Sequence, residues 1–234
     1  MSQIQIKQNQ FGHATNPKRA SDSNKLVSRR LGKFENVESL GQLGLELYAT
    51  KDFLNARDCA ALIEMIDAHC EPSAVLEDPR YPEAADFRTS YTCGFDREHP
   101  LVMDLDTKIC ALLGIDPRRG EPMQGQRYHP GQQCKPHFDA FVKYSPHWPM
   151  LRAHGGQRIW TVMVYLNEPD AGGETNFPDA LVSVKPETGM FATWNNLDPA
   201  GGMNEAAYHE GVAVTAGCKH TVTKWFRENF WSPG

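Results

Sequence analysis

The chain has 234 residues, of which 40% are hydrophobic and 10% aromatic, which is enough to bury the core of one large domain. Its formal net charge of -5 gives no general attraction to nucleic acid or to an anionic membrane, so we expect neither among its partners. No run of about 18 apolar residues occurs and the first residues lack an apolar signal-peptide core, so we expect a cytoplasmic protein. The six cysteines form no close pair and are expected to be reduced.

The first part of the chain divides into two regions. Residues 1–45 are a polar lead-in with little periodicity, which we expect to be partly disordered until it docks. Residues 46–120 form a helical or mixed support region. A helix is predicted over residues 55–69, with Asn55 as its N-cap. A second helix is predicted over residues 101–113, and Gly114 ends it.

Residues 121–234 are rich in short β-branched and aromatic runs that Gly, Pro, Asn and Asp separate. Many short strands without long helices between them favour an antiparallel barrel or jelly roll, so the predicted class is mainly β (α+β). The helices upstream would buttress one sheet of this core. Strands are predicted over residues 123–128, 134–141, 158–166, 181–184, 189–193, 211–215 and 220–226.

An imidazole and a carboxylate lie two residues apart at His137 and Asp139. If the strand continues through both, they project to the same face and can hold one metal ion. One nitrogen and one oxygen ligand are two-thirds of the facial triad that binds non-haem Fe(II). A third ligand must come from further along the chain, and the candidates are His147, His154, His209 and His220.

Strand geometry separates these candidates. His147 and His154 lie in an insertion bounded by Pro and Gly, Ser145 to Gly156, which we expect to cover a site rather than to supply a ligand. His209 lies ten residues before Lys219 with a turn between them, so both side chains can meet inside one barrel. A metal-chelating 2-oxo acid needs such a cation for its distal carboxylate. If Lys219 faces inward, its neighbour His220 faces outward and is not the ligand.

These motifs together resemble the prolyl 4-hydroxylase family of the 2-oxoglutarate- and Fe(II)-dependent dioxygenases. The resemblance follows the family's order over about three-quarters of the chain. It is carried by residues 126–128, 134–139, 155–158, 172–178, 184–186, 209 and 219–225, and more weakly by residues 52–54, 88–90 and 120–121. The resemblance implies a double-stranded β-helix, which is the jelly-roll core expected above.

The resemblance also implies residue roles. His137, Asp139 and His209 would be the catalytic iron ligands. Lys219 would pair with the C5 carboxylate of 2-oxoglutarate, and two hydroxyl groups would hydrogen-bond this cosubstrate, those of Tyr128 and Thr161. Residues that match the lining of a peptide groove are Arg88, Ser90, Glu121, Arg158 and Trp225. Two departures, Cys134 where relatives commonly have Tyr and Arg227 where many have His, leave the substrate more open than the chemistry.

The implied activity is hydroxylation of prolyl residues in a peptide or protein, at the 4-position, by molecular oxygen with decarboxylation of 2-oxoglutarate to succinate. Ascorbate is the expected reductant. One alternative keeps this chemistry but acts on a free amino acid or another small metabolite. Another is a non-catalytic barrel that senses iron or 2-oxoglutarate or binds proline-rich peptide, which the complete set of metal and cosubstrate residues disfavours.

Overall fold

The computed structural model describes residues 13–74 and 87–233. Residues 1–12, with which the polar lead-in begins, residues 75–86 and residue 234 lie outside the described residues. Within the described part of the chain, no helix is long and apolar enough to cross a membrane.

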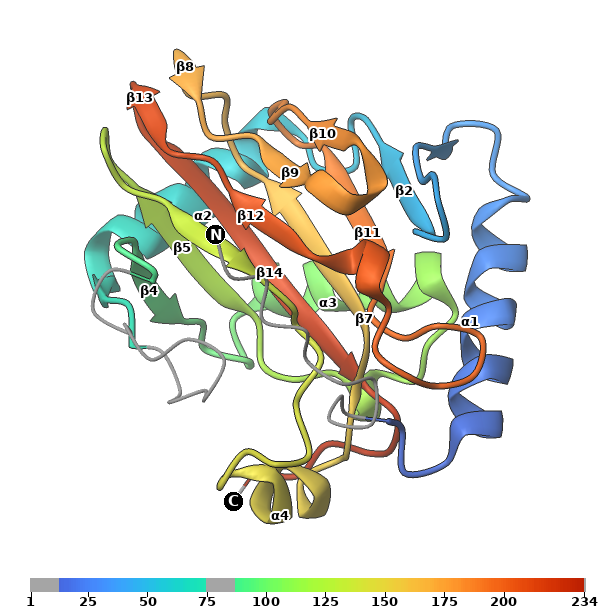
Figure 1. The fold of residues 1–234 in the computed structure, drawn as a ribbon. Helices are drawn as coiled ribbons and strands as arrows, with labels where there is room; N and C mark the ends of the chain where they lie inside the picture. The colour runs from blue at the N-terminus through green and yellow to red at the C-terminus, as the bar shows by residue number, and fades with distance from the viewer. Residues whose placement is uncertain (1–12, 75–86, 234) are drawn as a thin grey trace, which may run out of the picture.

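Two antiparallel sheets form the core, and helices cover the outer face of the larger one (Figure 1). This arrangement confirms the predicted jelly-roll core with buttressing helices. In spatial order the larger sheet consists of β1 (Glu38–Ser39), β2 (Leu47–Thr50), β11 (Phe191–Asn195), β7 (Arg158–Tyr165), β14 (Lys219–Arg227), β5 (Gln124–Tyr128), β4 (Tyr91–Gly94) and β3 (Glu71–Pro72).

The smaller sheet lies in front of the larger one in Figure 1 and consists of four strands in the order β10 (Val182–Val184), β9 (Thr175–Phe177), β12 (His209–Gly211) and β6 (Cys134–His137). A separate pair joins β13 (Val214–Ala216) to β8 (Ala171–Gly172). The strand predicted over residues 211–215 is therefore wrong, because the chain breaks it between β12 and β13.

The helices are α1 (Pro17–Leu31), α2 (Ala56–His69), α3 (Pro100–Leu113) and the short α4 (Trp148–Ala153), with 3-10 turns at Pro117–Arg119, Pro178–Ala180 and Glu205–Ala207. The predicted N-cap is confirmed, since the Asn55 side chain accepts the backbone N–H of Asp58 at 2.9 Å. The predicted stop after α3 is confirmed as well, because Gly114 adopts a left-handed conformation with φ of 68°.

Helix α1 lies within the segment expected to be a polar lead-in. Its inward face is narrow: Ala20, Val27 and Leu31 are buried, while Leu26 is 67% exposed. Asn16 caps its first turn through the backbone N–H of Arg19. The helix is polar over most of its surface, so its composition resembles that of a polar lead-in even though its buried residues recur at helical spacing, which explains why the sequence analysis did not indicate this helix.

Alternate residues of strand β7 face the apolar core and the pocket between the sheets. Val162 and Val164 point into the apolar cluster beneath the helices, where they meet side chains such as Leu62, Leu105 and Ile109. The alternate residues Thr161 and Met163 face the other way and line a pocket between the two sheets. This central strand therefore contributes apolar side chains to the core from one face and pocket-lining side chains from the other.

Candidate metal centre and active site

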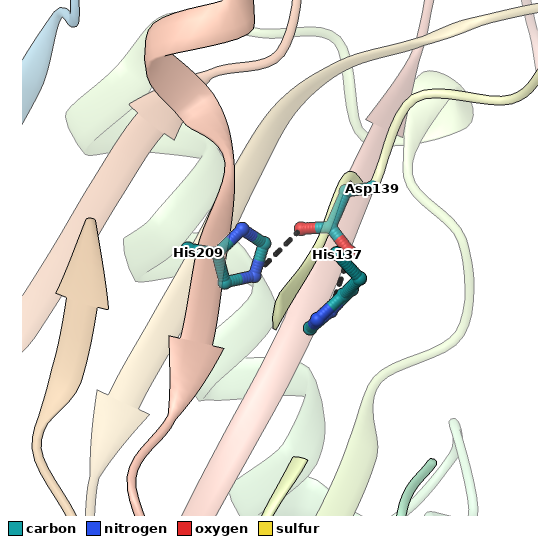
Figure 2. Close-up of side chains that lie close together, drawn as sticks. All are labelled: His137, Asp139 and His209. Carbon is teal, nitrogen blue, oxygen red and sulfur yellow. Dashed lines mark ion pairs between the residues drawn. The ribbon is translucent and has the colours of Figure 1, made fainter. Parts of the chain in front are cut away.

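The side chains of His137, Asp139 and His209 converge between the two sheets (Figure 2). One ligand atom from each lies within 4.8 Å of the others, the only such group of His, Cys, Asp or Glu in the described ranges 13–74 and 87–233. Asp139 Oδ1 lies 3.8 Å from Nε2 of His137, and Asp139 Oδ2 lies 3.7 Å from Nε2 of His209. The antiparallel register of β12 and β6 sets His209 opposite His137.

Asp139 reaches this group by a different route from the one that the strand pattern predicted. Strand β6 ends at His137, so Asp139 follows on a bend and not at the next inward position of a continuing strand. The strand expected to run to residue 141 is therefore wrong in its second half. The carboxylate still faces the histidines because its Oδ2 accepts a hydrogen bond from the Thr161 hydroxyl at 2.7 Å.

Both imidazoles are oriented by the backbone. Nδ1 of His137 lies 2.9 Å from the carbonyl oxygen of Lys135, and Nδ1 of His209 lies 3.0 Å from that of Ala207. A carbonyl can only accept, so in the neutral rings Nδ1 carries the proton and Nε2 keeps its lone pair. Each Nε2 faces the Asp139 carboxylate, which is the arrangement that metal-binding histidines require.

The protonation states also suit a cation. Burial alone raises the pKa of the Asp139 carboxyl, but the nearby charges of His209, His137 and Arg158 outweigh it and hold this pKa below its usual range. Burial, together with the charge of His137, lowers the pKa of His209 to about 4. At neutral pH the site therefore offers an ionised carboxylate and a neutral imidazole, the forms that bind divalent metals. Two imidazole nitrogens and one carboxylate oxygen fit Fe(II).

Lys219 lies in the same pocket as the three candidate ligands. It pairs in register with Tyr128 on β5, and its Nζ donates to the carbonyl oxygen of Gly173 at 2.6 Å. The ammonium also lies 5.5 Å from the ring centroid of Tyr165. Burial lowers the pKa of Lys219 to about 8. The pocket thus has a cation positioned to receive an anionic group.

His220 points to the opposite face of β14, as strand alternation predicts. Its Nε2 lies 3.1 Å from Oδ1 of Asp67 on α2, outside the pocket. It cannot belong to the metal group while Lys219 faces inward.

The two hydroxyls expected to bind the cosubstrate lie in different settings. Tyr128 is buried and lines the pocket beside Lys219, at 5.4 Å from Nζ to the ring centroid. The single proton of the Thr161 hydroxyl is donated to Asp139, and its oxygen accepts from Asn196 at 2.8 Å. Thr161 is therefore directed at a candidate metal ligand.

Three of the expected groove residues, Glu121, Arg158 and Trp225, contact one another. Arg158 binds both oxygens of the Glu121 carboxylate, at 2.7 and 2.8 Å, and its guanidinium lies 3.9 Å above the Trp225 ring. Trp225 lines the pocket. Burial raises the pKa of Glu121, but the charge and hydrogen bonds of Arg158 overcome this, and the net pKa is lowered.

The other two groove residues, Arg88 and Ser90, are joined to each other by a 3.0 Å hydrogen bond from Nε of the arginine. Arg88 lines the pocket, whereas Ser90 lies behind it and contacts Ser73 at 2.8 Å between hydroxyl oxygens. The structure thus brings four of the five groove candidates, all except Ser90, either to the pocket or into direct contact with Trp225 or Arg158.

The two residues noted as departures both lie close to this site. Arg227 is buried, with Nε 2.8 Å from the Glu121 carboxylate, so one acid faces two guanidinium groups. Cys134 lines the pocket with its Sγ 3.8 Å from Nδ1 of His137, and burial raises the pKa of this thiol to about 11. The insertion at residues 145–156, which was expected to cover the site, contains helix α4. It carries none of the pocket-lining residues.

Sequence reasoning missed two buried amides that organise the site. Asn196 contacts Thr161, and the Gln157 side chain both donates to and accepts from the backbone of Phe141, at 2.8 and 2.7 Å. Gln157 lies within a family-like stretch, which could have marked it. No motif or periodicity marks Asn196.

Comparison with known proteins agrees with this geometry. Residues 123–227 match the model of the 2OG-Fe(II) oxygenase superfamily. The probable prolyl 4-hydroxylase 10 of Arabidopsis thaliana is 27% identical over 239 residues, covering 89% of this chain and 80% of the relative. The prolyl 4-hydroxylase subunit alpha-1 of Gallus gallus is 35% identical over 131 residues, which span 56% of this chain and 25% of the subunit.

A solved structure is similar over most of the fold. The viral collagen prolyl hydroxylase of Paramecium Bursaria Chlorella virus-1, in its complex with 2OG, aligns with a TM-score of 0.60 and 26% identity. The alignment covers 79% of this chain and 96% of the viral protein. In its metal group, its buried lysine and these relatives, the chain is similar to the prolyl 4-hydroxylases of the 2OG-Fe(II) oxygenase superfamily.

Proposed function

We propose that this protein hydroxylates prolyl residues in a peptide or protein, at the 4-position, using Fe(II), 2-oxoglutarate and molecular oxygen. The observation that carries the proposal is the pairing of two elements in one pocket. His137, Asp139 and His209 offer three metal ligands, and the buried Lys219 offers a cation to the distal carboxylate of the cosubstrate. A pocket that only bound peptide would need neither.

Each residue has a defined task in this reaction. Fe(II), when bound, supplies the redox chemistry that couples decarboxylation of 2-oxoglutarate to succinate with hydroxylation of a C–H bond. The two histidines and Asp139 would hold the metal, because their ligand atoms converge from β6, its following bend and β12. Lys219 neutralises the cosubstrate where burial strengthens the attraction, and the Tyr128 hydroxyl lies in the same pocket.

The prolyl substrate is supported by the relatives, which include prolyl 4-hydroxylases of a plant and a bird and a collagen prolyl hydroxylase of a virus. The pocket wall suits a ring substrate, since Trp225 presents an aromatic surface beside the metal group. Arg88 lines the same pocket with a guanidinium that can donate to peptide carbonyl groups.

Two further features belong to the proposal. Ascorbate acts as the reductant that restores enzyme after uncoupled turnover. The protein works in a reducing compartment, the cytoplasm, in keeping with the free thiols of all six cysteines.

The proposal is tested with purified protein, Fe(II), 2-oxoglutarate, ascorbate and a panel of proline-containing peptides. Mass spectrometry is expected to show peptides heavier by one oxygen atom, and fragmentation with amino-acid analysis locates the hydroxyl on ring carbon 4. A parallel mixture of free amino acids and other small metabolites serves as the comparison. Oxidation confined to that mixture would contradict a peptide substrate while leaving the cosubstrate chemistry intact.

A further inference from the structure

A chain of buried hydrogen bonds runs from the residue after β11, through β7, to the carboxylate of the metal group. Asn196 Nδ2 donates to Thr161 Oγ1 at 2.8 Å, and Thr161 Oγ1 donates to Asp139 Oδ2 at 2.7 Å. The exposed fractions are 2% for Asn196, 1% for Thr161 and 7% for Asp139. Water therefore cannot readily replace either bond.

The direction of this chain follows from the chemistry of its ends. The ionised Asp139 carboxylate only accepts, so the single hydroxyl proton of Thr161 must go to it. The Thr161 oxygen can then accept only from the amide N–H of Asn196. The amide oxygen of Asn196 is buried and has no hydrogen-bond partner within residues 13–74 and 87–233. Leaving this acceptor unsatisfied costs stability, which indicates that the orientation of the Asn196 amide serves the Asp139 carboxylate.

The backbone around Asn196 is fixed at both of its polar groups. Its N–H donates to the carbonyl oxygen of Ile159 at 2.9 Å, and its carbonyl oxygen accepts the N–H of Asn204 at 3.0 Å. Thr161 is held in the middle of β7, paired with Trp194 on one side and Trp225 on the other. Thr161, which contacts Asp139 directly, thus lies within the sheet, and Asn196, which contacts it through Thr161, lies directly after β11 with both backbone polar groups hydrogen-bonded.

Asp139 needs such support because strand β6 has ended at His137, two residues earlier. With Oδ2 held by Thr161, Oδ1 is the oxygen left for a cation, and it accepts no hydrogen bond from the described residues. Residues that orient a metal ligand commonly change metal affinity about 10- to 100-fold when they are removed.

We propose that Thr161 and Asn196 are positioning residues that lock the Asp139 carboxylate for metal binding, and that the Thr161 hydroxyl serves Asp139 and not 2-oxoglutarate. This inference rests on the proposed Fe(II) site but goes beyond it, because it assigns Asn196 a role and changes the one that family resemblance implies for Thr161.

The test measures binding of Mn²⁺ alone to the 234-residue protein, by loss of the free Mn²⁺ electron paramagnetic resonance signal. Thr161→Val keeps the shape and removes the donor, and it is expected to weaken Mn²⁺ binding about 10-fold or more. Thr161→Ser restores the hydroxyl and is expected to bind within about 3-fold of the wild type. Asn196→Leu, which removes the donor to Thr161, is expected to fall between the two.

Thr193→Val is the matched control. Thr193 is equally buried and donates to the backbone carbonyl of Thr161 at 2.7 Å without touching the carboxylate. It is expected to leave Mn²⁺ affinity unchanged, which separates the loss of one donor to Asp139 from the loss of any buried hydrogen bond. Equal Mn²⁺ affinity in Thr161→Val and Thr193→Val would overturn the proposal.

A second measurement follows 2-oxoglutarate binding by calorimetry at saturating Mn²⁺. Affinity unchanged by Thr161→Val supports the assignment to Asp139, and a loss of 2-oxoglutarate affinity with intact Mn²⁺ binding would restore the cosubstrate role and refute ours. Neither readout needs turnover or a peptide, so a wrong substrate would not affect them. Failure of wild-type protein to bind Mn²⁺ would instead contradict the metal site itself.

Discussion

His209 of β12 is the cross-strand partner of His137 of β6, and the centroids of the two imidazole rings lie 4.3 Å apart. This pairing joins ligands that are far apart in sequence. We expect His209→Ala to weaken Mn²⁺ binding by more than about 100-fold, because one of three ligands is removed along with its oriented lone pair. His220→Ala is the control: it removes an imidazole on the outer face of the sheet and should leave Mn²⁺ binding intact. Similar losses in both variants would contradict the assigned ligand.

Lys219 makes cosubstrate binding depend on pH. Burial lowers its pKa to about 8, so the side chain is a cation below this pH and neutral above it. We expect 2-oxoglutarate affinity at saturating Mn²⁺ to fall as pH rises through about 8, by up to roughly tenfold for each further unit. Calorimetry from pH 7 to pH 9.5 checks this. Lys219→Met should bind weakly at every pH, and a flat profile in the wild type would count against the pairing.

The same burial should cost stability in the free protein. Between pH 8 and 10.5 the unfolded chain keeps a proton on Lys219 that the folded chain has lost, so wild-type stability rises with pH in this window. Below it, Lys219→Met is expected to be more stable than the wild type by roughly 2 kcal/mol. Urea unfolding of the metal-free proteins at pH 7 and pH 9.5 measures both effects. A less stable Met variant at pH 7 would show that the buried cation is well compensated.

The Glu121 carboxylate pairs with two guanidinium groups, that of the partly buried Arg158 and that of the buried Arg227. Glu121→Gln leaves both cations without this anion and is expected to destabilise the protein by about 3 kcal/mol. Adding Arg227→Met should recover part of this loss, because one unpaired charge is removed. Asp104→Asn, which breaks the exposed Lys108–Asp104 pair, is the control and should cost less than about 1 kcal/mol. An additive double variant would contradict the proposed coupling.

Glu228 ties the N-terminal segment to the site. Its buried carboxylate accepts the backbone N–H groups of Thr15, Asn16 and Gln157 at 2.7 to 3.2 Å. Glu228→Ala leaves these donors without an acceptor and is expected to lower the free energy of unfolding by about 3 kcal/mol. Glu187→Ala, which removes a surface ion pair with Lys51, should change it by less than about 1 kcal/mol. Equal effects in chemical denaturation would show that the segment is not anchored in this way.

Local patterns were enough to predict much of the fold and the chemical centre. The helices α2 and α3 carry clear caps, and β7 and β14 carry regular runs of apolar and β-branched residues. Strand alternation alone separated Lys219 from His220, because neighbours on a strand face opposite sides. The third ligand, His209, required both this argument and a family resemblance.

What the sequence did not predict depends on contacts between distant segments. Helix α1 is polar over most of its surface, so its composition resembles that of a polar lead-in. Its docking is visible only in the fold, where the Asn24 side chain donates to the carbonyl oxygen of Leu197 at 3.0 Å. Glu228 and Asn196 belong to no motif, because their roles come from the backbone groups and hydroxyls that the fold brings to them. The bend after β6 could not be predicted from the sequence either, because the two-residue spacing of His137 and Asp139 fits a continuous strand equally well.

The most direct test of the central claim is the stoichiometry of succinate and hydroxylated peptide in one reaction with the best peptide substrate. Wild-type protein is expected to form about one succinate for each hydroxyl group when oxygen, Fe(II) and 2-oxoglutarate are present. His137→Ala is expected to form neither product. Equal succinate formation by His137→Ala and wild type, or succinate without hydroxylation of any peptide, would contradict a prolyl hydroxylase that works through this metal site.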